Sequence, residues 1–239
     1  MQLTQILFSQ GFGSRRECAG LIAHGLVKVG GVTVDDPHQD FATHNFNFEV
    51  RGLLWPFKEK ALILLHKPSG YECSQKPKHH PIVMNLLPAP LRVRNVQPIG
   101  RLAEDTTGAL LMSDDGTLIH KLTSPKHHVP KVYEVACKHP VDARQVAALV
   151  AGVELHDETG RPTVKVAAAA AQQTGENSLQ LTLIDGKYHQ VKRMLAAVSN
   201  RVEGLHRSAF GAITIPPELK PGQWMWVEPA QVFDTESKS

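Results

Sequence analysis

The sequence lacks the features of a membrane-spanning, secreted or disulfide-linked protein. No apolar run approaches the roughly 20 residues of a membrane span, and no secretory signal peptide is visible at the N-terminus. The three cysteines, Cys18, Cys73 and Cys137, are odd in number, far apart and without paired spacing. This pattern argues against a disulfide framework or a zinc site. We therefore expect a cytoplasmic protein without a membrane partner.

The pattern of metal ligands on a helix is also missing. The chain has 13 histidines, but none form an i, i+4 pair beside an acid as in the known metal motifs. His79-His80 and His127-His128 are adjacent, and neighbouring side chains point in different directions. A histidine-based metallohydrolase therefore has no spacing to support it, and we expect most histidines to be polar residues or contacts to a partner.

The distribution of charge says more than its total. A net charge of +3 does not by itself indicate a nucleic-acid partner. Residues 117–131, however, carry three lysines and no acid, and residues 186–207 carry five Lys or Arg residues against one Glu. Clustered cations of this kind are typical of a surface that binds a phosphate backbone. A solvated basic face is the alternative interpretation.

The N-terminal residues have the pattern of a separate small module. Apolar residues recur at helical spacing within the first seven residues. Ser14 and Glu17 predict a capping box that opens a second helix, which ends before Gly25. Gly30-Gly31 lies between two Val-rich segments within 27–34, which predicts a β-hairpin with a two-residue turn.

Two arginines are oddly placed for stability alone. Arg15 and Arg16 lie in the first turn of the second helix, where the helix dipole repels cations. A phosphate bound at this helix start would resolve the conflict. The Ser-Arg-Arg segment, the apolar helix and the Val-x-Val hairpin together resemble the S4-like RNA-binding module. Thr4 departs from that pattern, since many relatives carry Asp there, and a generic helix–hairpin is the alternative.

The stretch Gly100–Met112 is a polar turn that runs into an apolar strand, a common location for chemistry. A plain surface turn is the alternative. The stretch resembles the signature of the bacterial rRNA pseudouridine synthases, in the branch that modifies small-subunit (16S) rRNA. That signature reads Gly-Arg-Leu-Asp, two further residues, Thr, any residue, Gly and an apolar strand. Every fixed position matches except the catalytic aspartate, which falls on Ala103.

Further motifs resemble the same family. Residues 52–60 have the composition of a linker, and the apolar residues 61–65 after it predict a strand buried on both faces. This strand delivers a Lys-Pro-x-Gly motif at 67–70, where the family has Asn in place of His66. The family's Lys-x-Tyr strand places Tyr133 against the target base, which an aromatic ring can hold by stacking; a core tyrosine is the alternative. In the motif at 186–194, Lys192 takes the position that pairs with the catalytic aspartate.

The resemblance implies an α+β fold. A small S4-like RNA-binding module, residues 1–58, would precede a pseudouridine synthase catalytic domain, residues 59–239, with a mixed, mostly antiparallel sheet and a central cleft. The implied activity is isomerisation of one uridine to pseudouridine, without cofactor or metal. The implied partner is small-subunit rRNA, alone or within an assembly particle, bound by a monomer. The implied catalytic positions are Ala103, Tyr133, Lys192 and Arg101, and the implied RNA contacts are Ser14, Arg15, Arg16, Lys28, Lys67, Lys126, His127, His128, Lys187, His189 and Arg193.

Ala103 has no carboxylate, so the sequence predicts that this chain binds rRNA without modifying it. Three explanations stay open: an engineered substitution that traps an inactive form, a natural RNA-binding or ribosome-assembly relative, or rescue by Asp105 or Glu104. Rescue is the weakest, because a misplacement of even ~1 Å can cost ~10²-fold in rate. We also expect Lys192 to recruit an RNA phosphate or a buffer anion as a substitute partner, with Asp105 pointing the wrong way.

Overall fold

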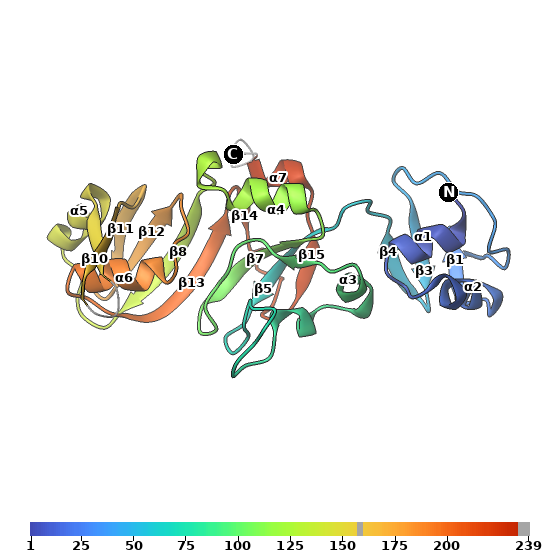
Figure 1. The fold of residues 1–239 in the computed structure, drawn as a ribbon, viewed down its shortest axis with the longest axis horizontal. Coiled ribbons are helices and arrows are strands. Elements are labelled where there is room, and N and C mark those ends of the chain that lie inside the picture. The colour runs from blue at the N-terminus through green and yellow to red at the C-terminus, as the bar shows by residue number, and fades with distance from the viewer. Residues whose placement is uncertain (157–159, 234–239) are drawn as a thin grey trace. The chain divides into compact units, whose positions relative to one another are not determined.

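The computed structural model describes residues 1–156 and 160–233. Contacts divide the chain into two compact units (Figure 1). The first unit comprises Met1–Ala61 and Met84–Gln97, and the second comprises Leu62–Val83 and the chain from Pro98 onward. The sequence analysis did not anticipate the return of residues 84–97 to the first unit. Arg94 helps to explain it, because its guanidinium donates to the Gln10 side chain at 2.9 Å and to the Glu59 carbonyl at 3.1 Å.

The first unit is built from two N-terminal helices and a four-stranded sheet in the order β2-β1-β3-β4. Its elements are α1 (Leu3–Ser9), α2 (Arg15–Ala23), β1 (Val27–Val29), β2 (Val32–Thr33), β3 (Asn47–Val50), β4 (Leu53–Pro56) and α3 (Ala89–Val93). The short helix η1 (Val83–Leu86) and the strand β6 (Gln97–Pro98) fall at the boundaries between the units.

Local sequence signals in this unit act as predicted. Glu17 N donates to the Ser14 hydroxyl at 3.3 Å, and the Glu17 carboxylate accepts from Ser14 N at 2.6 Å, so the capping box is confirmed. Gly30 and Gly31 both have positive φ, which a two-residue hairpin turn of this hand requires. The predicted linker is wrong in part, because residues 53–56 form β4. Trp55 is buried there against the edge of Phe12, a contact that local composition cannot reveal.

The second unit is organised around a larger mixed sheet, whose main path is β11-β12-β8-β13-β7-β5-β15. Within the described residues β13 runs parallel to β7, and the other strand pairs of this path are antiparallel. The strands are β5 (Leu62–Lys67), β7 (Thr107–Ser113), β8 (Lys131–Cys137), β11 (Ala170–Gly175), β12 (Ser178–Leu183), β13 (Val202–Phe210), β14 (Ile213–Thr214) and β15 (Trp224–Trp226). This architecture agrees with the predicted α+β fold class.

Helices and a small hairpin flank the sheet (Figure 1). They are α4 (Gly116–Thr123), η2 (Pro125–His127), α5 (Ala143–Ala151), α6 (Gln190–Ala197), α7 (Pro229–Phe233) and the antiparallel pair β9 (Val153–His156) and β10 (Pro162–Val166). Residues 163–171 do not form a single strand, because β10 pairs with β9 whereas β11 pairs with β12. The Ala-rich stretch has no alternation that could have marked the break.

The core of the second unit lies around β5 and β7. Residues 62–65 are all buried, which confirms the predicted strand covered on both faces. One of these faces packs with Leu122 of α4, Phe210 of β13 and Val232 of α7. No helix within the described ranges is long and apolar enough to cross a membrane.

Candidate active site

A pocket of about 420 Å³ lies in the second unit. Its walls come from the signature loop at 100–106, from β8, from the segment 183–192 and from the end of β13. It therefore brings together predicted site residues that are distant in the sequence. Those on its lining are Arg101, Ala103, Tyr133, Lys187, His189 and Lys192.

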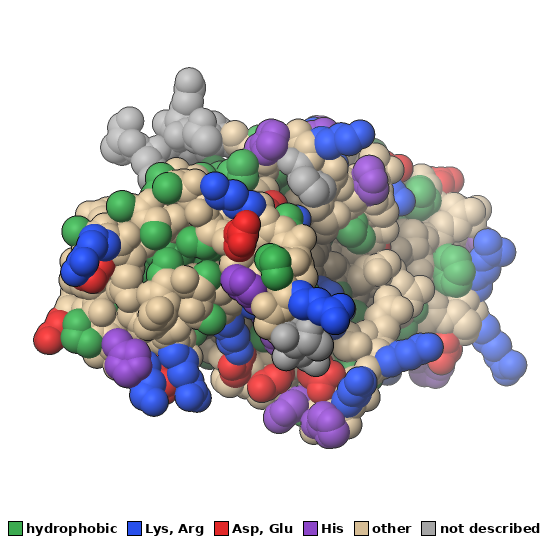
Figure 2. All heavy atoms as spheres, turned by 60° about the vertical axis from the view of Figure 1, so that its left-hand side comes forward, with side chains coloured by type: hydrophobic (Ala, Val, Ile, Leu, Met, Phe, Trp, Pro, Cys, Tyr) green, Lys and Arg blue, Asp and Glu red, His purple; other side chains and the backbone are tan. Residues whose placement is uncertain are grey.

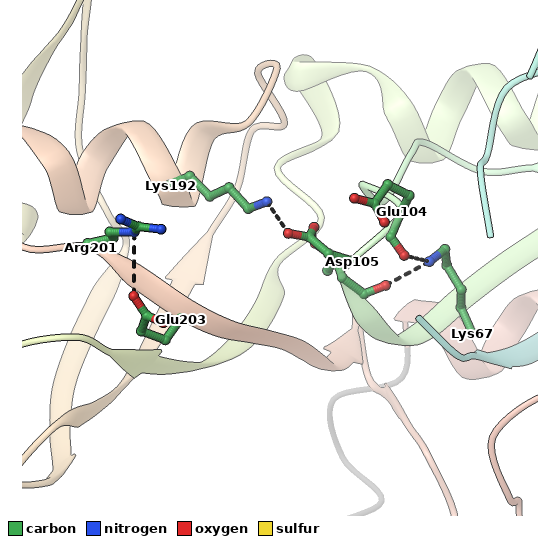
Figure 3. Close-up of polar contacts among 7 residues, drawn as sticks. Lys67, Glu104, Asp105, Lys192, Arg201 and Glu203 are labelled. Atoms are coloured by element: carbon green, nitrogen blue, oxygen red, sulfur yellow. Dashed lines mark hydrogen bonds and ion pairs between the residues drawn. The ribbon is translucent and has the colours of Figure 1, made fainter. Parts of the chain in front are cut away.

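Lys67 of the Lys-Pro-x-Gly motif fixes the signature loop by hydrogen bonds to its backbone (Figure 3). Lys67 Nζ donates to the backbone carbonyls of Pro68 at 3.0 Å, Glu104 at 3.0 Å and Thr106 at 2.8 Å. Gly70 N also donates to the Glu104 carbonyl, at 2.9 Å. Burial lowers the pKa of Lys67, opposed by the neighbouring Cys73, Glu104 and Asp105. Lys67 is fully buried with its three donors in use, so its predicted role as an RNA contact is wrong.

The glycine of the signature is required by the parallel strand pair. Gly108 has φ +112°, a conformation that side-chain-bearing residues rarely adopt. A Cβ atom there would lie 2.2 Å from the Arg207 carbonyl oxygen on β13. Glycine thus allows β7 and β13 to approach, which places Arg207 next to the loop that bears Ala103.

Lys192 has a protein counterion. Its ammonium, carried on α6, lies 2.6 Å from Asp105 Oδ2 (Figure 3). Burial raises the pKa of Asp105, but the hydrogen bond and the charge of Lys192 outweigh this effect, so the pKa lies below its ordinary value. The expectation that Asp105 points the wrong way for Lys192 is therefore wrong. A turn closed by the hydrogen bond from Thr106 N to the Ala103 carbonyl, 3.1 Å, changes the direction of the chain between the two positions.

Ala103 and Asp105 nevertheless face different spaces. Ala103 is on the lining of the pocket, and Asp105 is not. Asp105 borders a shallower hollow together with Thr107, Glu134 and His206. None of the described residues that line the pocket beside Ala103 is acidic.

The deepest charged groups of the pocket were not among the predicted site residues. Lys131 and Arg207 line it and are 9% and 2% exposed. Lys131 Nζ donates to the Val129 carbonyl at 2.9 Å, and Arg207 Nε donates to the Ala109 carbonyl at 2.7 Å. In the sequence Arg207 was only a member of a basic stretch, and Lys131 was the lysine of the Lys-x-Tyr motif without a role of its own. The period-two alternation of a strand, which places Lys131 on the same face as Tyr133, was the available signal.

The start of α6 is shaped by Gln190. Gln190 is buried, accepts from Lys187 N at 2.8 Å and donates to Asp185 at 2.6 Å. His189 has φ +48°, and its ring stacks on that of Tyr188 with centroids 3.9 Å apart. Burial and the cation Lys192 lower the pKa of His189, opposed by Asp105. Tyr188, a residue that the sequence analysis passed over, is 71% exposed beside the pocket.

The remaining predicted RNA contacts lie apart from the pocket lining. Arg15, whose guanidinium lies 5.3 Å from the centre of the Phe8 ring, is exposed. Arg193 donates to the His156 carbonyl and to the Thr163 hydroxyl, so it ties α6 to the β9–β10 pair. The others are exposed: Ser14, Arg16, Lys28, Lys126, His127 and His128. On the face drawn in Figure 2, acidic side chains lie between the basic ones. These contacts to RNA stay predictions.

A small N-terminal unit of helices and a four-stranded sheet, together with a mixed sheet that bears a cation-lined pocket, are the parts expected of an enzyme that works on RNA. Comparison with known proteins makes this specific. Residues 61–197 match the model of the RNA pseudouridylate synthase family, and residues 1–41 match the S4 domain. The chain belongs to the RNA pseudouridylate synthase family, whose activity is isomerisation, and it carries an S4 domain in front of the catalytic domain.

Relatives and a solved structure extend the likeness over most of the chain. Ribosomal small subunit pseudouridine synthase A of Salmonella typhimurium is 43% identical over 67% of this chain and 68% of its own. The protein of the same name from Vibrio cholerae is 36% identical over 87% of this chain and 89% of its own. A crystal structure of a pseudouridylate synthase is 29% identical, covers 97% of this chain and 98% of its own, and has a TM-score of 0.66.

Proposed function

We propose that this chain binds small-subunit rRNA in the cytoplasm as a monomer and accepts one extruded uridine in the pocket beside Tyr133, but leaves that uridine unchanged. The relatives carry the name ribosomal small subunit pseudouridine synthase A, which supports the choice of RNA. The position of Ala103 on the pocket lining supports the part of the proposal that the uridine is left unchanged. The family chemistry needs a carboxylate there, ionised at neutral pH with a reference pKa near ~3.9.

Each part of the pocket has a role in this proposal. Extraction of a base from structured RNA exposes it to stacking, and Tyr133 offers a buried ring on the lining. Lys192, across the pocket from Ala103, would orient a carboxylate at position 103 if one were present. Arg101 is exposed beside Ala103 and would meet the phosphate next to the extruded nucleotide.

We further propose that residues 1–58 act as the RNA-anchoring module and residues 59–239 as the module that receives the uridine. The exposed Arg15 and Arg16 at the start of α2 support the first assignment. Residues 157–159 and 234–239 of the second module lie outside the described residues. Free rRNA and an assembly particle would both present a phosphate backbone to the two modules.

The second candidate function is a non-catalytic rRNA-binding or ribosome-assembly factor on the same fold, for which rRNA binding is the whole function and no uridine enters the pocket. The ion pair between Lys192 and Asp105 favours it, because the family's basic residue is already neutralised by a carboxylate outside the pocket lining. Rescue by Asp105 would require this pair to break and the side chain to turn toward the pocket.

The decisive experiment restores the carboxylate. Small-subunit rRNA is treated with the chain as it stands, with Ala103→Asp and with Ala103→Asn, which has a similar shape but no nucleophile. Pseudouridines are then mapped by chemical labelling and primer extension. We expect one new pseudouridine with Ala103→Asp and none with the other two, while all three bind the rRNA. Robust modification by the unaltered chain would show that position 103 does not carry the nucleophile.

A further inference from the structure

We propose that Tyr188, at the rim of the pocket, stacks on the nucleobase next to the extruded uridine, so that the chain selects a uridine whose neighbour in the strand is also unpaired. This inference rests on the proposed function, because it names the class of RNA that the same site accepts. It concerns a base outside the pocket and requires no change to the uridine inside.

Tyr188 is an aromatic residue that the fold leaves open to solvent. It is on the pocket lining, yet it is 71% exposed, more than any other aromatic residue in the described part of the chain. A tyrosine that served the core would be mostly covered, as Tyr133 is at 8%. Burial therefore does not explain the presence of this ring at the rim.

Tyr188 and His189 form a pair of nearly parallel rings. Their centroids are 3.9 Å apart, and the ring planes are inclined by 18°. Because His189 covers one face of the tyrosine ring while most of the residue is exposed, the opposite face is open. A nucleobase has the flat shape and the π-face to occupy that position, and it would extend the pair to a stack of three rings.

The backbone that carries the two rings is fixed on both sides. Gln190, which is 4% exposed, accepts from Lys187 N at 2.8 Å and donates to Asp185 at 2.6 Å. Between these contacts His189 has φ +48°, a conformation that residues with a side chain rarely adopt. The two rings are thus held in place before a ligand arrives, and little conformational entropy is lost when a base stacks on them.

The charges around the ring pair suit a strand of RNA. Burial and the cation Lys192 lower the pKa of His189, so the imidazole under Tyr188 is neutral at neutral pH. The exposed cations Arg101 and Lys187 are also on the pocket lining, where phosphates on either side of an extruded nucleotide would meet them. Aromatic rings beside cations are the combination by which proteins bind single-stranded nucleic acids.

The base on Tyr188 is the neighbour of the uridine rather than the uridine itself. The proposed function places the uracil beside Tyr133, a buried residue, whereas Tyr188 borders solvent where the strand leaves the pocket. A neighbouring base that stays paired and stacked in a helix has no free face to offer. The platform therefore favours a uridine in a loop or bulge over one in a continuous duplex.

The test uses the trinucleotide ApUpA and three versions in which an abasic ribose replaces the first, second or third base. All four carry the same number of phosphates, so differences in affinity report on the bases. Binding to the full chain is measured by isothermal titration calorimetry. With the unaltered chain, one of the two flanking replacements should weaken binding by roughly 5- to 150-fold, the range for one base on an aromatic side chain.

Matched variants identify the ring responsible. Tyr188→Leu keeps an apolar side chain without a ring and should reduce the cost of that replacement to less than about two-fold. Tyr188→Phe and Tyr188→Trp should retain it. Phe233→Leu is the control, because Phe233 is 42% exposed but outside the pocket lining. Thermal melts of all variants should match that of the unaltered chain, since both rings are largely open to solvent.

The inference is wrong if the flanking adenines contribute equally in the unaltered chain and in Tyr188→Leu, or contribute in neither. The version without the central uracil separates the two proposals. A cost for the central uracil without a cost for a neighbour that depends on Tyr188 refutes only the inference. The reverse result supports stacking on Tyr188 and refutes the proposed function. No binding of ApUpA at millimolar concentration would refute both.

Discussion

Lys192 on α6 and Asp105 on the signature loop form an ion pair of 2.6 Å, two residues along the chain from Ala103 on the pocket lining. Lys192 lies on the pocket lining and Asp105 lies outside it, and their contact ties α6 to the loop. Ala103, between Leu102 and Glu104, presents only a methyl group to the pocket. The pair therefore preserves the electrostatic link between loop and helix without supplying a nucleophile inside.

Removal of the pair should change stability only above acidic pH. The pKa of Asp105 is lowered in the folded chain, so its contribution is present above the ordinary pKa and is lost as pH falls through the folded value. We expect Asp105→Asn to lower the free energy of unfolding by less than about 1 kcal/mol near pH 7, because the carboxylate is half exposed. The difference from the unaltered chain should vanish in acid. Glu203→Gln, which removes a longer pair of 3.4 Å with Arg201, is the control in urea melts.

Lys131 should also make stability rise with pH, but in the alkaline range. Between about pH 8 and pH 10.5 the unfolded chain binds more protons at Lys131 than the folded chain does. The free energy of unfolding should therefore rise with pH in this range. Relative to Lys131→Met, the gain should be on the order of 2 kcal/mol. Urea melts from pH 7 to pH 10.5 measure it, with Lys121→Met as the exposed reference. Parallel curves for the unaltered chain and Lys131→Met would contradict the lowered pKa.

Lys67 should act on the signature loop rather than on RNA. Lys67→Met removes three buried hydrogen bonds to backbone carbonyls, so we expect a loss of about 2–4 kcal/mol in the free energy of unfolding. In the Ala103→Asp background the same change should lower the rate of uridine modification, because the loop is displaced. Lys76→Met, at an exposed lysine, is the control. Weaker rRNA binding with normal stability would restore Lys67 as an RNA contact.

The arginines at the start of α2 give the test of the RNA-anchoring module. Arg15→Glu combined with Arg16→Glu should weaken rRNA binding and flatten its dependence on salt, since fewer phosphates are neutralised. Thermal stability should stay equal or rise, because acids suit the start of a helix. Arg144→Glu makes the same change in the first turn of α5, at another exposed position, and should affect stability alone. A double variant that melts early but binds normally would assign the arginines to folding.

Patterns that depend on near neighbours in the chain were predictable from the sequence. The capping box at Ser14, the turn at Gly30-Gly31 and the buried strand after residue 60 rest on hydrogen bonds and periodicities within a few residues. The order of the motifs was also sufficient to predict the α+β fold and the family. The assignment of Ala103 to the position of the family's catalytic aspartate also came from the sequence alone, and it stays a prediction.

Contacts between distant segments were decided by the tertiary structure. Lys67 resembled a surface cation until the sheet buried it beneath the signature loop, and Asp105 could be placed against Lys192 only once the turn and α6 were in position. Lys131 and Arg207 are far apart in the sequence, and the pairing of β8 with β13 brings both onto the lining of the pocket. Sequence spacing constrains the direction of a side chain over a few residues. The group that it meets is set by packing across the whole domain, where burial and charge also acquire their energetic consequences.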